Sequence, residues 1–140
     1  MGVIPWAPLA SGWLSGRWRK DTGPPGSTRA DRLPARYDLS QPANQRKLDA
    51  VEDLAQLADT VGITLIELAI AFVLNHPAIT AAILGARTME QLQSQLPAGD
   101  VVLDDAVLDR IDEIVVPGST VNPVDNSFAN PALQPAARRR

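Results

Sequence analysis

Residues 83–91 combine the residue types that bind an anion where a strand meets a helix. An apolar run ends at Gly85, and Thr88 can cap a helix that follows it. Free backbone N–H groups and the positive end of a helix dipole favour an anion at such a junction. Gly85 lets a ligand approach the backbone closely, and the planar guanidinium of Arg87 suits a phosphate or an aromatic base. An ordinary turn with an exposed arginine is the alternative interpretation.

Residues 6–16 form a second candidate ligand-binding segment, which reads Trp-Ala-Pro-Leu-Ala-Ser-Gly-Trp-Leu-Ser-Gly. This segment follows a short apolar run at residues 3–6, so we expect it at the end of a strand. It offers hydroxyl groups, glycines and the apolar wall of Trp6 to a ligand. A plain turn whose tryptophans belong to the core is the alternative.

A basic stretch rich in proline and glycine follows at residues 17–44. Residues 17–36 hold six basic and two acidic side chains, a local net charge of +4 in a chain whose net charge is −3. Neither helix nor strand periodicity is present. Loops longer than about 12–15 residues are usually functional or disordered. We therefore expect one long irregular segment, which is either a flexible linker or a mobile lid that binds an anion.

Helical spacing of apolar residues and local capping signals predict the elements that position these segments. The expected elements are a strand at 3–6, a helix at 45–61 capped by Asn44 and ended by Gly62, a helix at 64–75 with a Thr64–Glu67 capping box, a strand at 79–84, a helix at 88–96 with a Thr88–Gln91 capping box, and a helix at 104–115 capped by Asp104.

The run at residues 79–84 is apolar throughout, which is typical of a strand in a parallel sheet covered by helices. The helix at 64–75 is apolar nearly all round and needs burial on several sides. Two strands can neither close a barrel nor cover such helices. The sequence therefore predicts part of a larger α/β domain.

Composition excludes several other classes. A net charge of −3 gives no general attraction for nucleic acid or a membrane surface, and the absence of Cys excludes disulfide, Cys-zinc and thiol chemistry. The apolar stretch at 63–74 is shorter than the ~20 residues of a membrane span. A DNA-binding helix-turn-helix is disfavoured because the helix at 64–75 has no Arg or Lys. His76 and the acidic residues of 104–113 indicate no metal site, and a cytoplasmic location is expected.

Residues 3–17 and 82–92 resemble two motifs of the aldo-keto reductases. The first, Val-Ile-Pro-Trp-Ala-Pro-Leu-Ala-Ser-Gly-Trp-Leu-Ser-Gly-Arg, is similar to their seventh strand and its following loop, and the second to their eighth strand and last barrel helix. The resemblance covers residues 2–116 and is strongest to the branch of potassium-channel β-subunits and bacterial reductases. It implies an α/β fold, the C-terminal part (strands 7 and 8 with their helices) of a (β/α)8 TIM barrel.

The resemblance divides the chain into a partial reductase domain at residues 1–116, with a mobile cofactor loop at 17–44, and a Pro-rich C-terminal tail at 117–140. It implies NADP(H) as cofactor and hydride transfer between NADPH and an aldehyde or ketone. By resemblance, the nicotinamide would lie near Trp6, the pyrophosphate near Pro8, Leu9, Ser11 and Arg17, the 2′-phosphate near Arg29, and the adenosine end near Gly85, Arg87, Gln91 and Gln95.

Three residues depart from the family pattern: Ala7, Ser94 and Gln95 stand where the family often has Ser, Glu and Asn. The family's catalytic Asp, Tyr, Lys and His come from earlier strands and have no matching positions here, so we assign no catalytic residue. Tyr37 and His76 lie in unrelated contexts. Two hypotheses remain: the C-terminal portion of an NADP-dependent reductase, and a non-catalytic module or truncated gene product that binds a partner or itself.

Overall fold

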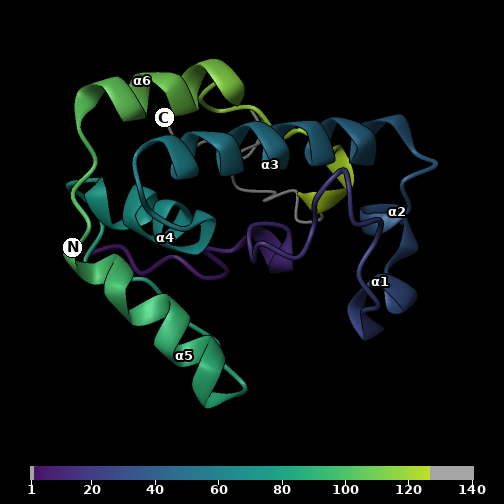
Figure 1. The fold of residues 1–140 in the computed structure, drawn as a ribbon, viewed down its shortest axis with the longest axis horizontal. Coiled ribbons are helices and arrows are strands. Elements are labelled where there is room, and N and C mark those ends of the chain that lie inside the picture. Colours follow the sequence, from purple (N-terminus) through teal and green to yellow (C-terminus); the bar gives the residue numbers. More distant parts are fainter. Residues whose placement is uncertain (1, 127–140) are drawn as a thin grey trace, which may run out of the picture.

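The computed structural model describes residues 2–126, which are mostly helical (Figure 1). The elements, in chain order, are η1 (Ala10–Gly12), α1 (Thr28–Arg32), α2 (Pro34–Tyr37), α3 (Pro42–Thr60), α4 (Leu65–Asn75), α5 (Met89–Gln95), η2 (Leu96–Asp100), α6 (Asp105–Ile114) and η3 (Pro123–Asp125).

Helix α3 is the centre of the arrangement. Figure 1 shows it running between α6 on one side and α4 on the other, and it contacts both helices. Its buried face carries small and medium apolar side chains, which allow neighbouring helices to approach closely. The core is formed by the following buried residues from the N-terminal loop, from α2, α3, α4 and α6, and from the segment before α6: Trp13, Trp18, Tyr37, Val51, Ala55, Ala58, Leu65, Leu68, Ala71, Leu103, Val107 and Ile111.

Several predicted helix ends are confirmed. Thr64 and Glu67 form a reciprocal capping box at the start of α4, and Gly62 follows α3 with a φ of 77°. Asp104 caps α6 by accepting a hydrogen bond from the Val107 N–H at 2.9 Å. These signals are read correctly from sequence because a cap is satisfied by residues two to four positions away.

The predicted capping box at α5 is half wrong. Thr88 does cap the helix, since its hydroxyl accepts from the Gln91 N–H at 3.2 Å. The Gln91 side chain, however, accepts from the N–H of Arg87 at 2.9 Å, one residue before the cap. The glutamine therefore closes the turn that carries Arg87 instead of the cap residue itself.

The two predicted strands pair in parallel, as expected, but each is reduced to isolated bridges. Val3 pairs with Ile79 and Trp6 pairs with Ile83. The Ile83 N–H donates to the Pro5 carbonyl at 3.0 Å. Among residues 2–126, no further segment joins this pair, which explains why regular strands do not form.

The expectation of one irregular segment at 17–44 is wrong. It contains α1, α2 and the first turn of α3. Ser27 caps α1 by accepting from the Arg29 and Ala30 N–H groups, and Pro34 and Pro42 occupy the first turns of α2 and α3. Proline favours that position because its fixed φ suits a helix and its missing N–H is not needed there.

The start of α3 also corrects the role of Asn44. This residue is buried inside the helix and does not cap it. Its side chain donates to the carbonyl oxygens of Ala35 and Asp38, at 3.1 and 2.9 Å, and so ties α3 to α2.

Residues 117–126, the described part of the predicted tail, return to the helical body. The short turn η3 contacts α2 (Figure 1). The three terminal arginines and the rest of 127–140 lie outside the described residues. In the described range, no individual helix has both the length and the hydropathy of a membrane span; α3 and α4 meet that test only together, across a bend of 91°.

Candidate functional site

The two predicted ligand-binding segments meet at one edge of the parallel pair. The bridge between Trp6 and Ile83 places the loop after residue 6 beside the turn at residues 84–88. The carboxyl ends of parallel strands lie at the same edge, and ligands of α/β proteins bind there. The structure thus brings together the two segments that the sequence singles out.

The loop at residues 7–12 has an unusual backbone. Ala7, Ala10 and Ser11 have φ values of 57°, 47° and 59°, and Gly12 has a φ of 101°. Left-handed backbone costs a non-glycine residue roughly 1 kcal/mol, so three such residues in one loop need support from their surroundings. Part of this support is local, since the Gly12 N–H donates to the Leu9 carbonyl at 2.8 Å.

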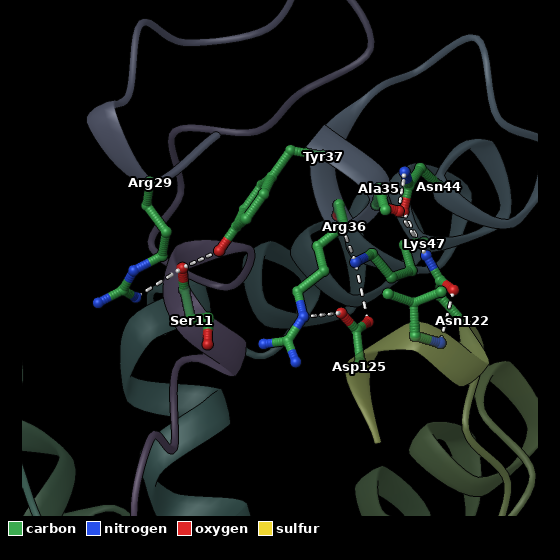
Figure 2. Close-up of polar contacts among 10 residues, drawn as sticks. Ser11, Arg29, Ala35, Arg36, Tyr37, Asn44, Lys47, Asn122 and Asp125 are labelled. Atoms are coloured by element: carbon green, nitrogen blue, oxygen red, sulfur yellow. Dashed lines mark hydrogen bonds and ion pairs between the residues drawn. The ribbon is translucent and has the colours of Figure 1, made fainter. Parts of the chain in front are cut away.

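The rest of the support comes from the 28–37 region and converges on one atom. The carbonyl oxygen of Ser11 accepts from the Tyr37 hydroxyl at 2.9 Å and from the Arg29 guanidinium at 3.1 Å (Figure 2). Arg29 is exposed, and its hydrogen bond with Ser11 holds the guanidinium against the loop. Arg17 is also exposed, and its guanidinium donates to the Gly26 carbonyl at 3.1 Å. The loop is therefore contacted by the Arg29 side chain, while Arg17 is held by Gly26.

An aromatic cluster, formed by Trp13, Trp18 and Tyr37, packs behind this loop. The Trp13 and Trp18 rings stack with centroids 4.2 Å apart, and both lie 5.7 Å from the Tyr37 ring. All three side chains are buried. The Lys47 ammonium lies 4.3 Å from the centroid of a Trp13 ring, a cation–π contact.

Lys47 is an unusual buried cation. Its Nζ donates to the Arg36 carbonyl at 2.8 Å and to the Asp125 carboxylate at 2.9 Å. Burial lowers the pKa of Lys47, and the hydrogen bond with Asp125 opposes that change. The role of Lys47 was not predicted from the sequence. The available signal was the concentration of aromatic residues, since four of the six in the chain fall within residues 6–37.

The other candidate segment, at residues 83–91, is largely exposed to solvent. Gly85 has free space where a side chain would stand, and Arg87 is exposed with its backbone N–H bound by Gln91. Trp6 is 78% exposed beside this segment. Gln95 differs from the other predicted residues because it is 7% exposed and lies at the end of α5.

The predicted site residues therefore fall into three groups by exposure. Trp6, Arg17, Arg29, Gly85, Arg87 and Gln91 are exposed, Pro8, Leu9 and Ser11 are half-buried, and Gln95 is buried. In residues 2–126, no group of three His, Asp or Glu side chains is placed to hold a metal ion. Chemically, the arrangement offers cations, backbone amides and an apolar ring to an anionic ligand with a planar group.

Comparisons with known proteins agree on the class of protein. A sequence model of the "Aldo/keto reductase family" matches residues 1–116. A protein of Arabidopsis thaliana named "Probable voltage-gated potassium channel subunit beta" is 34% identical over 121 residues, which cover 82% of this chain and 35% of that protein. The "Uncharacterized oxidoreductase YrpG" of Bacillus subtilis is 33% identical over 114 residues, covering 81% of this chain and 32% of that protein.

The chain thus spans about a third of the length of these relatives. The family match covers most of the sequence and includes both strand-end segments described above. The family fold is a TIM barrel, which agrees with the parallel pairing of the two segments. The chain belongs to the aldo/keto reductase family of oxidoreductases.

Proposed function

We propose that this chain supplies part of the NADP(H) site of an oxidoreductase that transfers hydride between NADPH and an aldehyde or ketone. The observation that carries the proposal is the parallel pairing of Trp6 with Ile83, which sets the two ligand-binding segments side by side. In this proposal the paired segments are strands 7 and 8 of the barrel. Phosphate sites of such barrels are frequently built by the loops after these two strands.

Each segment has a distinct task in the proposed complex. The exposed indole of Trp6 stacks on the nicotinamide, because a flat apolar ring covers one face of a planar ligand. The loop containing Pro8, Leu9 and Ser11 lies along the pyrophosphate, with Arg17 beyond it. Guanidinium groups bind phosphate through two parallel N–H donors, which suits Arg17 to this role.

The adenosine part of the cofactor, with its 2′-phosphate, contacts the remaining predicted residues. Arg29 reaches the 2′-phosphate from above the loop, and Gly85, Arg87 and Gln91 hold the adenosine end. Open space at Gly85 and the exposure of Arg87 support this assignment. Gln95, which the resemblance assigns to the adenosine end, is buried at the end of α5.

The reaction also needs a proton donor beside the carbonyl, and by resemblance that donor comes from earlier strands of the barrel, which have no matching positions in this chain. Tyr37 is unsuited to that task because its hydroxyl donates to the Ser11 carbonyl and its ring is buried. His76 is exposed at the end of α4, where its Nδ1 accepts from the Ala78 N–H. The chain therefore contributes to cofactor binding and leaves proton transfer to another part of the barrel.

The proposal is tested by titrating the purified protein with NADPH and NADH, in the wild type and the Arg87→Met variant. Charge-assisted hydrogen bonds are worth roughly 1.5–3 kcal/mol, so Arg87→Met is expected to weaken NADPH binding by about tenfold or more. Arg110→Met on α6, where Arg110 pairs with Glu113 at the surface, is the matched control and leaves binding unchanged. Failure of the wild type to bind either nucleotide, or tight binding by Arg87→Met, contradicts the proposal.

A second candidate function is association with another polypeptide, as in a non-catalytic module. It is favoured by the exposure of Val3, Ile4 and Ile83 on the parallel pair and of Phe72 on α4. Contiguous exposed apolar side chains mark interaction surfaces. Sedimentation at several protein concentrations tests this candidate: mass above that of one chain supports it, and a monomer at every concentration argues against it.

A further inference from the structure

The segment Asn122–Asp125, here called the C-terminal clamp, contacts residues more than seventy positions earlier. The Asn122 side chain is buried, and its amide donates to the Asn44 side-chain oxygen at 2.7 Å and to the Ala35 carbonyl at 3.3 Å. The same side chain accepts from the Val124 N–H at 3.0 Å and so fixes its own turn. The clamp is thus joined to both α2 and α3.

Asn44 extends this contact along α2. Its amide donates to the carbonyl oxygens of Ala35 and Asp38. These two residues stand on either side of Tyr37 in the sequence. The pair of buried asparagines therefore holds the backbone before and after the tyrosine (Figure 2).

Asp125 completes the arrangement through charge. Its carboxylate accepts from the Lys47 ammonium at 2.9 Å and lies 3.9 Å from the Arg36 guanidinium. The same ammonium donates to the Arg36 carbonyl and lies over the Trp13 ring. A buried ammonium that loses its carboxylate partner is strongly unfavourable, so the position of Lys47 depends on Asp125.

We infer that the C-terminal clamp is a positioning device for the loop at residues 7–12. The clamp fixes the backbone of residues 35, 36 and 38, this backbone places Tyr37, and the Tyr37 hydroxyl holds the Ser11 carbonyl. Figure 2 shows both ends of this series of contacts, from Asp125 and Asn122 to Ser11. Asn122 and Asp125 act through other residues and are therefore positioning residues, not catalytic residues. The effect on cofactor affinity rests on the function proposed above.

The first test measures the loop itself, without any nucleotide. In Asp125→Asn, amide hydrogen exchange at Gly12 and Leu14, whose N–H groups close the loop, is expected to accelerate about tenfold. Asp125→Glu keeps the charge and is expected to restore part of the protection. Asp112→Asn, an exposed carboxylate on α6, is the matched control and leaves these amides unchanged.

The second test measures NADPH affinity in a double-mutant cycle. Asp125→Asn and Tyr37→Phe are each expected to raise the Kd about five- to tenfold. The Kd of the double variant is expected to be no higher than that of the single variant that binds NADPH less tightly. A merely structural role of Asp125 gives independent effects that multiply. Multiplying effects, or loop amides that exchange at the wild-type rate in Asp125→Asn, overturn the inference.

The two proposals fail in different ways. A wild-type protein that binds no NADPH contradicts the proposed function, whereas the hydrogen-exchange comparison still decides whether the clamp controls the loop. Asn122→Ala is a second variant for that comparison. It removes the contact with Asn44 and the cap of the turn that carries Asp125, and it is expected to accelerate exchange at the same two amides.

Discussion

The hydroxyl of Tyr37 donates a 2.9 Å hydrogen bond to the carbonyl oxygen of Ser11, a residue whose backbone is left-handed with a φ of 59°. The bond joins α2 to the loop that we propose to lie along the cofactor pyrophosphate. Because the Tyr37 ring is stacked against Trp13 and Trp18, the hydroxyl is held by a buried and rigid group. A residue outside the loop therefore supports its conformation, together with Arg29 and the hydrogen bond between Gly12 and Leu9.

Replacing Tyr37 with Phe removes this hydrogen bond and retains the stacked ring. A hydrogen bond of this kind contributes about 1 kcal/mol, so the free energy of unfolding should fall by about that amount and the NADPH Kd should rise about fivefold. Isothermal titration and urea unfolding measure the two quantities. Thr60→Ala removes a hydroxyl bound to the Gln56 carbonyl on α3 and should leave the Kd unchanged. An unchanged Kd in Tyr37→Phe contradicts the role given to its hydroxyl.

Gly12→Ala should destabilise the protein through its backbone alone. A side chain at this position meets nothing within 4 Å, but the φ of 101° is unfavourable for alanine. We expect a loss of about 1–2 kcal/mol in the free energy of unfolding, measured with urea. Gly26→Ala is the matched control, since Gly26 has equally open space and no left-handed φ. Equal stability of the two variants argues against strain in the loop.

Gly85→Ala is expected to weaken NADPH binding without changing the stability of the protein. Gly85 has open space around it and lies outside the left-handed region, so alanine should leave the unfolding midpoint unchanged. The added methyl group should nevertheless obstruct a nucleotide that approaches the backbone, and the NADPH Kd should increase. A destabilised variant, or one with unchanged affinity, excludes this reason for the glycine.

The sequence predicts best those features whose causes are local. Thr64 and Glu67, Asp104, and Gly62 each satisfy a helix end through neighbours in the chain, and all are confirmed. The parallel pairing of the runs at 3–6 and 79–84 follows from their apolar character and the helices between them. Of the candidate site, the sequence predicts that the two segments meet, because the ends of parallel strands share an edge.

The features that the sequence analysis misses depend on distant partners. Asn44 has the residue type of an N-cap, yet its partners include Asn122 at the other end of the described chain. The importance of Lys47 and Tyr37 likewise depends on Asp125 and Ser11. The helices α1 and α2 are a different case, because the cap at Ser27 and the proline at 34 are local signals that were available.

The contact between Arg19 and Glu52 predicts a dependence of stability on pH. The guanidinium donates to both carboxylate oxygens, at 3.0 and 2.7 Å, and these hydrogen bonds hold the pKa of Glu52 below its ordinary value of 4.5. A carboxyl whose pKa is lower in the folded state stabilises the fold above its unfolded pKa. This contribution is lost as the pH falls through the lower, folded-state pKa.

Glu52→Gln should therefore lose less stability than the wild type when the pH falls from about 5 to about 3. Urea unfolding at a series of pH values measures the difference. Glu113→Gln alters an ion pair that is largely exposed on α6 and should keep the wild-type pH dependence. Parallel curves for Glu52→Gln and the wild type would show that the Arg19 contact does not stabilise the fold.

Trp13 is expected to respond very differently to two substitutions. Its Nε1 is buried and has no hydrogen-bond partner among the described residues. Trp13→Phe removes this unsatisfied donor and keeps an aromatic ring, so it should cost no more than about 1 kcal/mol. Trp13→Ala leaves a cavity in the aromatic cluster and should cost about 3–5 kcal/mol. Similar losses in both variants would mean that the indole N–H contributes to stability.

The contact between Lys47 and Asp125 also imposes an order on folding. The loop at residues 7–12 is made before the carboxylate that fixes Lys47, which follows that lysine by 78 residues. Contacts of such sequence separation form late, because the chain between them must be ordered first. Until then Tyr37 lacks its full support, and the loop remains free to change conformation. The proposed nucleotide site is thus expected to be among the last parts of residues 2–126 to become rigid, after α3 and α4 have formed.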